Sequence, residues 1–227
     1  VHWHGLHVPD DMDGHPRHAI GPGQTYNYEF QVLNRAGTYW YHPHPHTLTG
    51  PQVYKGMAGL FLVSDDEETA AGLPSGEFDV PLIIQDRTFD ADNQLSYLPV
   101  GTNDTIMGFL GERILVNGQP DFVLPVATRP YRLRILNGSN SRVYKLGWQD
   151  GTPLTVIATD GGLLEKPLQR SYVTLAPAER VELWVDFSGR TVGSELRLQS
   201  LTFNGVACAG VGMFGGCPLP KVPVGSE

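Results

Sequence analysis

Histidine is missing from most of this chain, because all eight histidines of the 227-residue sequence lie at or before position 46. His2 and His4 stand in one run, and His42, His44 and His46 stand in a second run. Histidines scattered over a surface would not stop at one point of the chain. The distribution therefore predicts one metal-binding region, followed by a long scaffold that holds no imidazole ligand.

Other scarcities exclude whole classes of partner. No apolar run approaches the roughly 20 residues that a membrane-spanning helix needs, so we expect no membrane partner. The formal net charge is −8 and no basic patch is present, so we expect no nucleic-acid partner. Cys208 and Cys217 are the only cysteines, and they flank a glycine-rich loop without nearby histidine. We expect them to form a local disulfide if the protein is exported, rather than to bind metal.

Turn-forming residues are abundant, with 27 glycines and 18 prolines, and long helical patterns are missing. This composition predicts an all-β fold. Alternation of apolar and polar residues, or short apolar runs, predict strands at residues 26–32, 38–41, 59–63, 80–84, 131–136, 181–186 and 195–200. Asn117–Gly118 and Asn137–Gly138 are dipeptides that favour tight turns.

The pattern divides the chain into four segments. These are a first β-domain with the histidines at 1–64, a connector with a short helical turn at 65–79, a second β-domain at 80–203, and a loop and linker at 204–227. The first segment has four or five predicted strands, which are too few for a closed barrel, and the chain begins inside a histidine motif. We therefore expect a piece of a longer protein whose first domain lacks its N-terminal strands.

The spacing of the histidines has a direct geometric consequence. Alternate side chains of a strand point to the same face, so His2 and His4 project together, as do His42 and His44. Two such strands side by side would bring four imidazoles to one space. A catalytic zinc typically has about three protein ligands, so four imidazoles suit a cluster of two or three metals. Copper heads the affinity order for imidazole sites, although a single zinc or a structural pair is an alternative.

The neighbours of these histidines carry a family resemblance. His-Trp-His-Gly at 2–5 and Gly-Thr-Tyr-Trp-Tyr-His-Pro-His at 37–44 resemble the first two copper motifs of the multicopper oxidases, the family of laccases, bilirubin oxidases and bacterial cuprous oxidases. Pro-Leu-Ile-Ile-Gln-Asp-Arg at 81–87 and Leu-Ala-Pro-Ala-Glu-Arg at 175–180 resemble the family's second domain. The resemblance covers nearly the whole chain. It implies two cupredoxin-like Greek-key sandwich or barrel domains, of which only the first binds copper.

The resemblance also implies an activity and a ligand set. It implies an oxidoreductase that oxidises phenolic, aromatic or cuprous substrates by one-electron steps and reduces dioxygen to water at a three-copper cluster. His2 matches a ligand of the type 2 copper, and His4, His42 and His44 match ligands of the type 3 pair. We expect the other histidines not to bind copper; they are His7, His15, His18 and His46.

Asp13 matches the position where bacterial members of the family place a proton-relay acid. Oxygen reduction consumes protons, and a carboxylate beside a buried cluster could deliver them. Asp13 is followed by Gly14, and Asp-Gly is also an ordinary turn, so both interpretations stand. Three other acids fall in second-domain motifs, and we expect them to cap turns or to pair with arginine; they are Asp86, Asp160 and Glu179.

The sequence departs from the family pattern in one large respect. The family's third domain would supply the type 1 copper site and the other four cluster histidines, and these residues are not in the sequence. We therefore expect a third domain or another chain to complete the cluster, and no oxidase activity from this polypeptide alone. The resemblance implies an extracellular or periplasmic location. It leaves the reducing substrate open.

Two alternatives to the oxidase hypothesis use the same histidines. One is a non-enzymatic copper-binding or copper-buffering protein, which would not need the whole second domain or a relay acid. The other is a zinc hydrolase, since His-x-His also occurs on the first strand of metal-dependent amidohydrolases. That fold needs alternating strands and helices and later histidine ligands, and the sequence shows neither.

Overall fold

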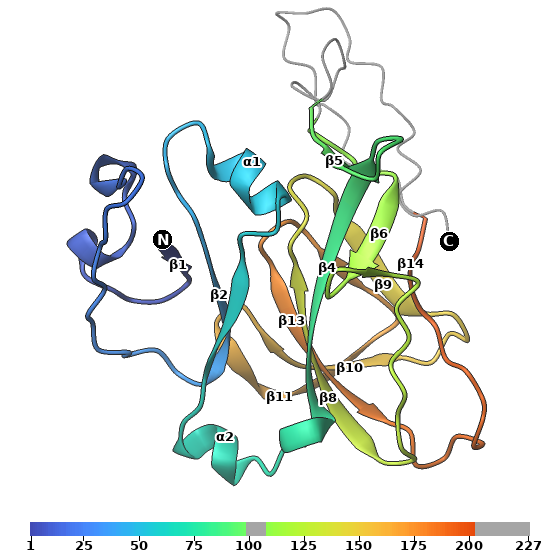
Figure 1. Cartoon of the computed structure of the whole chain (residues 1–227). Helices are drawn as coiled ribbons and strands as arrows, with labels where there is room; N and C mark the ends of the chain where they lie inside the picture. Colours follow the sequence, from blue (N-terminus) through green and yellow to red (C-terminus); the bar gives the residue numbers. More distant parts are fainter. Residues whose placement is uncertain (99–107, 203–227) are drawn as a thin grey trace, which may run out of the picture.

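The computed structural model describes residues 1–98 and 108–202, and strands dominate this part of the chain (Figure 1). Its helices are short: α1 spans Thr49–Tyr54 and α2 spans Asp66–Ala70, with single 3-10 turns at Asp10–Met12, Pro16–His18 and Gly76–Phe78. The all-β prediction is confirmed. Within the described residues, every helix falls short of the length and apolarity that crossing a membrane requires. Cys208, Cys217 and the predicted linker at 204–227 lie outside the described residues.

The histidine motifs lie on a three-stranded antiparallel sheet. Its strands are β1 (His2–His4), β2 (Gly37–His42) and β3 (Gly59–Val63), in the order β1-β2-β3. The strands predicted at 38–41 and 59–63 are confirmed, but the expected four or five strands before residue 64 are three in the described structure. The strand predicted at 26–32 is wrong. That segment is extended with alternate burial, yet no described strand pairs with it, so its backbone has no ladder partner.

A larger sheet follows in the sequence. Its order is β11-β10-β13-β8-β4-β6-β7, with β5 paired to β4; β4 and β8 run parallel and the other pairs are antiparallel. Its strands are β4 (Asp79–Phe89), β5 (Leu95–Ser96), β6 (Arg113–Val116), β7 (Gln119–Pro120), β8 (Pro130–Asn137), β10 (Leu154–Thr159), β11 (Gly162–Arg170) and β13 (Arg180–Asp186). A third sheet has the order β12-β9-β14 and comprises β12 (Val173–Leu175), β9 (Tyr144–Trp148) and β14 (Leu198–Ser200).

The main apolar core is formed by the large sheet and the β12-β9-β14 sheet. Leu133 and Ile135 of β8 and Leu183 of β13 point into it and are at most 3% exposed. Tyr144 and Leu146 of β9 meet them. Burying a side chain of this size stabilises a fold by roughly 1.5–3 kcal/mol, so this cluster holds the two sheets together.

The opposite face of the same strands is charged. Arg132 and Arg134 of β8 and Glu182 of β13 are at most 2% exposed, and they face the histidine-bearing sheet instead of solvent. Arg132 Nε and Arg134 Nη1 donate to Glu182 at 2.7 and 3.2 Å, and Thr38 Oγ1 of β2 donates to it at 2.7 Å. Buried charges are tolerated when paired in this way. The period-2 prediction for β8 and β13 is confirmed, but the sequence did not predict that their polar face is buried.

The connector supplies one more partner for this charged layer. Asp65 caps α2 by accepting from Glu68 N at 2.8 Å, which confirms the predicted helical turn. Glu68 then reaches Arg132 and Arg134, and its Oε1 lies 2.9 Å from Arg134 Nη2. The connector therefore joins the two sheets by ion pairs as well as by the chain.

The two predicted turn dipeptides differ in outcome. Asn117 and Gly118 have φ values of 50° and 78° and join β6 to β7, as a tight hairpin requires. The turn predicted at Asn137–Gly138 is wrong, because Asn137 is the last residue of β8. Its buried side-chain amide donates to the carbonyls of Arg142 and Leu175 at 2.7 and 2.9 Å. The strand predicted at 195–200 begins only at Leu198, where pairing with β9 starts.

Candidate metal centre

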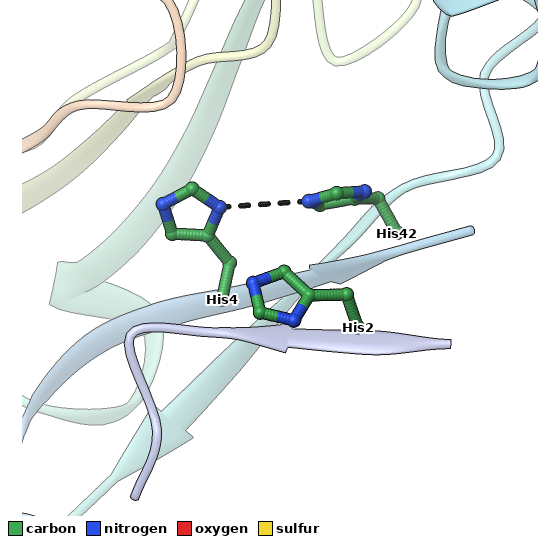
Figure 2. A group of neighbouring side chains, drawn as sticks. All are labelled: His2, His4 and His42. Carbon is green, nitrogen blue, oxygen red and sulfur yellow. Dashed lines mark hydrogen bonds between the residues drawn. The ribbon is translucent and has the colours of Figure 1, made fainter. Parts of the chain in front are cut away.

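Strand pairing brings the two histidine motifs together. His2 is opposite His42 in the register of β1 and β2, and His4 is opposite Trp40. Figure 2 shows the three imidazoles on one side of these strands, with nitrogens of His4 and His42 facing each other. One ligand nitrogen from each of the three histidines lies within 4.8 Å of the other two, and His4 Nδ1 is 3.5 Å from His42 Nε2. The predicted convergence of imidazoles is present for His2, His4 and His42.

His44 lies beside this group but is more exposed. It follows the end of β2, and its ring centroid lies 5.5 Å from that of His2 and 5.9 Å from that of His42. It does not join the group of nitrogens within 4.8 Å. Its ligand role stays a prediction.

Hydrogen bonds orient two of the rings. His2 Nδ1 lies 3.0 Å from the backbone carbonyl of Asp13, and His42 Nδ1 lies 2.9 Å from the carbonyl of Pro43. A carbonyl can only accept, so each Nδ1 carries the proton. In the neutral ring, Nε2 is then the nitrogen that can bind a metal, in the way that outer hydrogen bonds fix the tautomer of metal-binding histidines.

The electrostatics of the site favour neutral imidazoles. Burial lowers the pKa of His4 to about 4, with help from the Arg180 guanidinium and the neighbouring imidazoles. Burial also lowers the pKa of His42, against an opposing hydrogen bond to the Pro43 carbonyl. Metal binding requires the deprotonated ring, so His4 and His42 are in their ligand form at neutral pH.

The donor set fits a first-row transition metal. Nitrogens that share one ion lie at most about 4.2 Å apart, because each metal–nitrogen bond is about 2.1 Å long. The 3.5 Å between His4 Nδ1 and His42 Nε2 is within that limit. Imidazole ligands without thiolate suit copper, zinc, iron or nickel.

The other histidines lie outside this group. His7, His15 and His46 are exposed, and His15 Nδ1 accepts a hydrogen bond from the backbone of Arg17. The His18 ring stacks on Tyr26 with centroids 6.3 Å apart. That they do not bind copper stays a prediction.

The aromatic residues of the motifs take different positions. Trp40 stacks on His4 at 4.9 Å between ring centroids, lies 4.4 Å from His42, and is 5% exposed, so it shields the site. Trp3 points to the opposite face, where it contacts Tyr28 and Phe30. Trp3 lies away from the imidazoles because it alternates with His2 and His4 along β1.

Asp13 reaches the site from the turn that ends the first 3-10 segment. Its Oδ1 lies 3.0 Å from His2 Nδ1, and its side chain is 43% exposed. Gly14 adopts φ +72°, and an added Cβ would lie 2.0 Å from the carbonyl oxygen of Val1, so the turn is packed closely against β1. The turn and the site interpretations of Asp13 are therefore compatible.

The acids of the second-domain motifs pair as expected. Asp86 Oδ2 lies 2.9 Å from Arg142 Nε, and Asp160 Oδ1 lies 3.3 Å from Arg180 Nη1. Glu179 accepts a hydrogen bond from the backbone of Ala176 and closes a turn. Sequence reasoning missed the role of Arg180, which lies within reach of the histidine motifs; the only signal was its place in Leu-Ala-Pro-Ala-Glu-Arg.

Comparison with known proteins agrees with this geometry. Residues 1–68 match the family model for multicopper oxidases. A laccase of Bacillus stratosphericus is 40% identical over 207 residues, and the match covers 83% of this chain and 40% of the laccase. The cell division protein FtsP of Edwardsiella tarda is 42% identical, over 81% of this chain and 39% of FtsP. The crystal structure of the multicopper oxidase McoA from Aquifex aeolicus matches with a TM-score of 0.82 and 43% identity, over 89% of this chain and 45% of McoA.

The fold is thus the cupredoxin-like one of the copper oxidases, with a histidine site on its first sheet. The chain belongs to the multicopper oxidase family. It spans about 40% of the length of these curated relatives.

Proposed function

We propose that this chain supplies His2, His4, His42 and His44 to the three-copper cluster of a multicopper oxidase. The observation that carries the proposal is the group of three imidazole nitrogens within 4.8 Å. Bound copper would carry electrons from a phenolic, aromatic or cuprous substrate to dioxygen, which is reduced to water. By family resemblance, His2 holds the type 2 copper, and the other three histidines hold the type 3 pair. A third domain or another chain supplies the type 1 site and the remaining ligands.

The residues of this chain have separate tasks in that activity. His2 and His42 would hold copper through Nε2, because backbone carbonyls accept the protons on their Nδ1 atoms. Trp40 covers His4 and His42 and keeps water away from them. Asp13 carries protons from solvent towards the site: its side chain is partly exposed, and its Oδ1 accepts no hydrogen bond from the described residues although it lies 3.0 Å from His2 Nδ1.

The same proposal includes the organisation and location of the protein. Residues 1–64 form part of a first cupredoxin-like domain, 65–79 a connector, 80–203 a second domain without copper, and 204–227 a linker. The charged layer between the sheets supports a division near the connector, since every buried residue of the main apolar cluster comes after the connector in the sequence. The protein is extracellular or periplasmic, as the resemblance to exported copper oxidases implies.

One relative bears on the alternative of a non-enzymatic copper-binding protein. The Edwardsiella tarda relative is named as a cell division protein, although its identity to this chain is as high as that of the laccase. Overall identity therefore does not separate a relative named as a laccase from one named for cell division, so the test of function has to be made at the metal site. The zinc-hydrolase alternative is wrong for this fold, because it required alternating strands and helices.

Copper loading followed by electron paramagnetic resonance tests the proposal. The purified chain is loaded with Cu(II), desalted and compared with His42→Ala and with His7→Ala as the control, since His7 is exposed and outside the group. In the chain alone, we expect a single Cu(II) on the group formed by His2, His4 and His42. Its type 2-like signal with nitrogen coupling should be present in the wild type and in His7→Ala and should be lost in His42→Ala. We also expect no blue type 1 signature and no oxygen uptake by the chain alone.

Three results would contradict parts of the proposal. Retention of zinc in place of copper would show that the histidine group is not a copper site. Copper binding by His42→Ala that equals that of the wild type would show that other residues bind the copper. Oxygen uptake at oxidase rates by this chain alone would show that no further domain is needed. A copper-binding chain that stays inactive after the missing part is supplied would favour the binding protein.

A further inference from the structure

Arg180 is a buried cation that contacts both histidine-bearing motifs. It begins β13, its side chain is 3% exposed, and its Nε donates to the Thr38 carbonyl of β2 at 2.9 Å. Its Nη2 would lie 2.9 Å from a Cβ added at Gly5, the residue that follows His4. One guanidinium therefore lies against the strand that ends in His42 and against the turn that leaves His4.

The local chain fixes this guanidinium in position. Nη1 and Nη2 donate to the carbonyls of Ala178 and Asp160, each at 3.1 Å. The Arg180 amide donates to Asp160 Oδ1 at 2.6 Å. Ala178 adopts φ +74°, so the turn before β13 is bent to present its carbonyl to the guanidinium. All three nitrogens of the guanidinium have an acceptor, as a rigid planar fork allows.

Gly5 is the matching feature of the first histidine motif. Its φ is +89°, and a side chain there would collide with Arg180 Nη2 and with Tyr39. Glycine is therefore required both by the backbone conformation and by the approach of the guanidinium. The final glycine of His-Trp-His-Gly and the final arginine of Leu-Ala-Pro-Ala-Glu-Arg meet at this contact.

Strand β2 is held to the large sheet at neighbouring points as well. The Thr38 hydroxyl donates to Glu182 and accepts from Arg134 Nη1 at 3.2 Å. A Cβ added at Gly37 would lie 3.1 Å from Gly162 Cα, so the two backbones are nearly in contact. His42 follows four residues after Thr38 on the same face of β2, so a shift of the anchored end of the strand would move the imidazole.

We propose that Arg180 is a positioning residue for the copper site, which sets the separation of the His4 and His42 imidazoles by holding β2 and the Gly5 turn to β13. The inference rests on the proposed copper site and goes beyond it, because it gives the copper-free part of the chain a role in metal binding. Arg180 itself does not touch the metal. Its effect is on geometry, in the way that groups outside a metal's ligands orient those ligands.

Arg180→Lys tests the inference, with Arg142→Lys as the matched control. Arg142 is also a buried arginine with one carboxylate and one carbonyl partner, but these are Asp86 and Gly111 rather than the histidine-bearing strands. We expect Arg180→Lys to weaken Cu(II) affinity, measured by chelator competition, by about 10-fold and to change the hyperfine coupling of the resonance signal. Arg142→Lys should leave both unchanged even where its melting temperature falls equally.

Hydrogen exchange of the wild-type chain gives a test that does not depend on a variant that folds. Coupling between two sites is reciprocal, so Cu(II) binding should slow amide exchange at 176–182 as well as in β1 and β2. The segment around Asp86 serves as the internal reference. Slowing confined to β1 and β2, or an Arg180→Lys variant with wild-type affinity and coupling, would overturn the inference. A wild-type chain that binds no Cu(II) would instead refute the copper site on which it rests.

Discussion

Adjacent residues of β13 show two different ways of burying a side chain. Leu183 is fully buried in the apolar core, where its neighbours are other apolar side chains. Glu182 is equally buried on the opposite face, but it is held by specific bonds to Thr38, Arg132 and Arg134. The apolar core therefore tolerates substitution by other apolar side chains of similar volume. The interface with the histidine-bearing sheet instead depends on specific hydrogen bonds and ion pairs.

The difference explains where precision is needed in this protein. The sheet β1-β2-β3 has few buried apolar residues of its own, since one of its faces carries the imidazoles, Trp40 and Thr38. It gains its position from ion pairs and hydrogen bonds to β8 and β13. Such bonds fix register and distance, and a metal site with ligands on two strands requires both.

The largest effect is expected from Glu182→Ala. It leaves two buried guanidinium groups without their shared carboxylate, and breaking a buried pair in this way typically costs about 3–5 kcal/mol. We expect the free energy of unfolding in urea to fall by that amount and copper affinity to fall with it. Glu195→Ala, at an exposed position, is the control. A Glu182→Ala variant with unchanged copper affinity would show that the interface does not position the site.

Leu183→Ala separates stability from positioning. It creates a cavity in the apolar core, and such substitutions cost about 2–5 kcal/mol. We expect the free energy of unfolding to fall to a similar extent as in Glu182→Ala, while Cu(II) affinity at 25 °C stays within the error of the wild type. Parallel urea titrations and chelator competitions on the two variants check this contrast. If Leu183→Ala and Glu182→Ala lost copper affinity equally, the charged face of β13 would have no special role in positioning the site.

The charged interface should also respond to pH. Burial raises the pKa of Glu68, but hydrogen bonds from Ser64, Arg132 and Arg134 outweigh it and leave the pKa below the ordinary value of 4.5. A carboxyl with a lowered pKa in the folded state contributes stability above the unfolded pKa and loses it as pH falls. We therefore expect wild type to exceed Glu68→Gln in unfolding free energy at pH 7, and the difference to shrink below pH 4.5. If the difference in unfolding free energy between wild type and Glu68→Gln did not change with pH, the charge of Glu68 would not contribute to stability.

The smallest effect concerns the two faces of the first sheet. Trp40 stacks on His4, whereas Trp3 lies on the opposite face. Added Cu(II) should quench tryptophan fluorescence mainly through Trp40, since quenching by a paramagnetic ion falls with distance. We expect Trp40→Phe to lose most of the quenching and Trp3→Phe to keep it. The reverse result would place the metal on the other face.

Much of the fold could be predicted because it depends on local patterns. The strands at 59–63, 131–136 and 181–186 follow from alternation or short apolar runs, and the hairpin at Asn117–Gly118 follows from turn chemistry. The segment at 26–32 has the same alternation, but no described strand pairs with its backbone. A period of two shows that a segment is extended, and only neighbouring backbone decides whether it joins a sheet.

The residues that could bind metal, and the strand face that they share, follow from the local sequence alone. His2 and His4 project together on any extended strand, and the clustering of all histidines before residue 47 marks one site. Only the tertiary structure decided that His2 lies opposite His42, that Asp13 meets His2, and that Arg180 spans β2 and the Gly5 turn. The hydrogen bond between Arg180 and Thr38 joins residues 142 positions apart, and no local pattern encodes which distant residue will supply a carbonyl or a guanidinium.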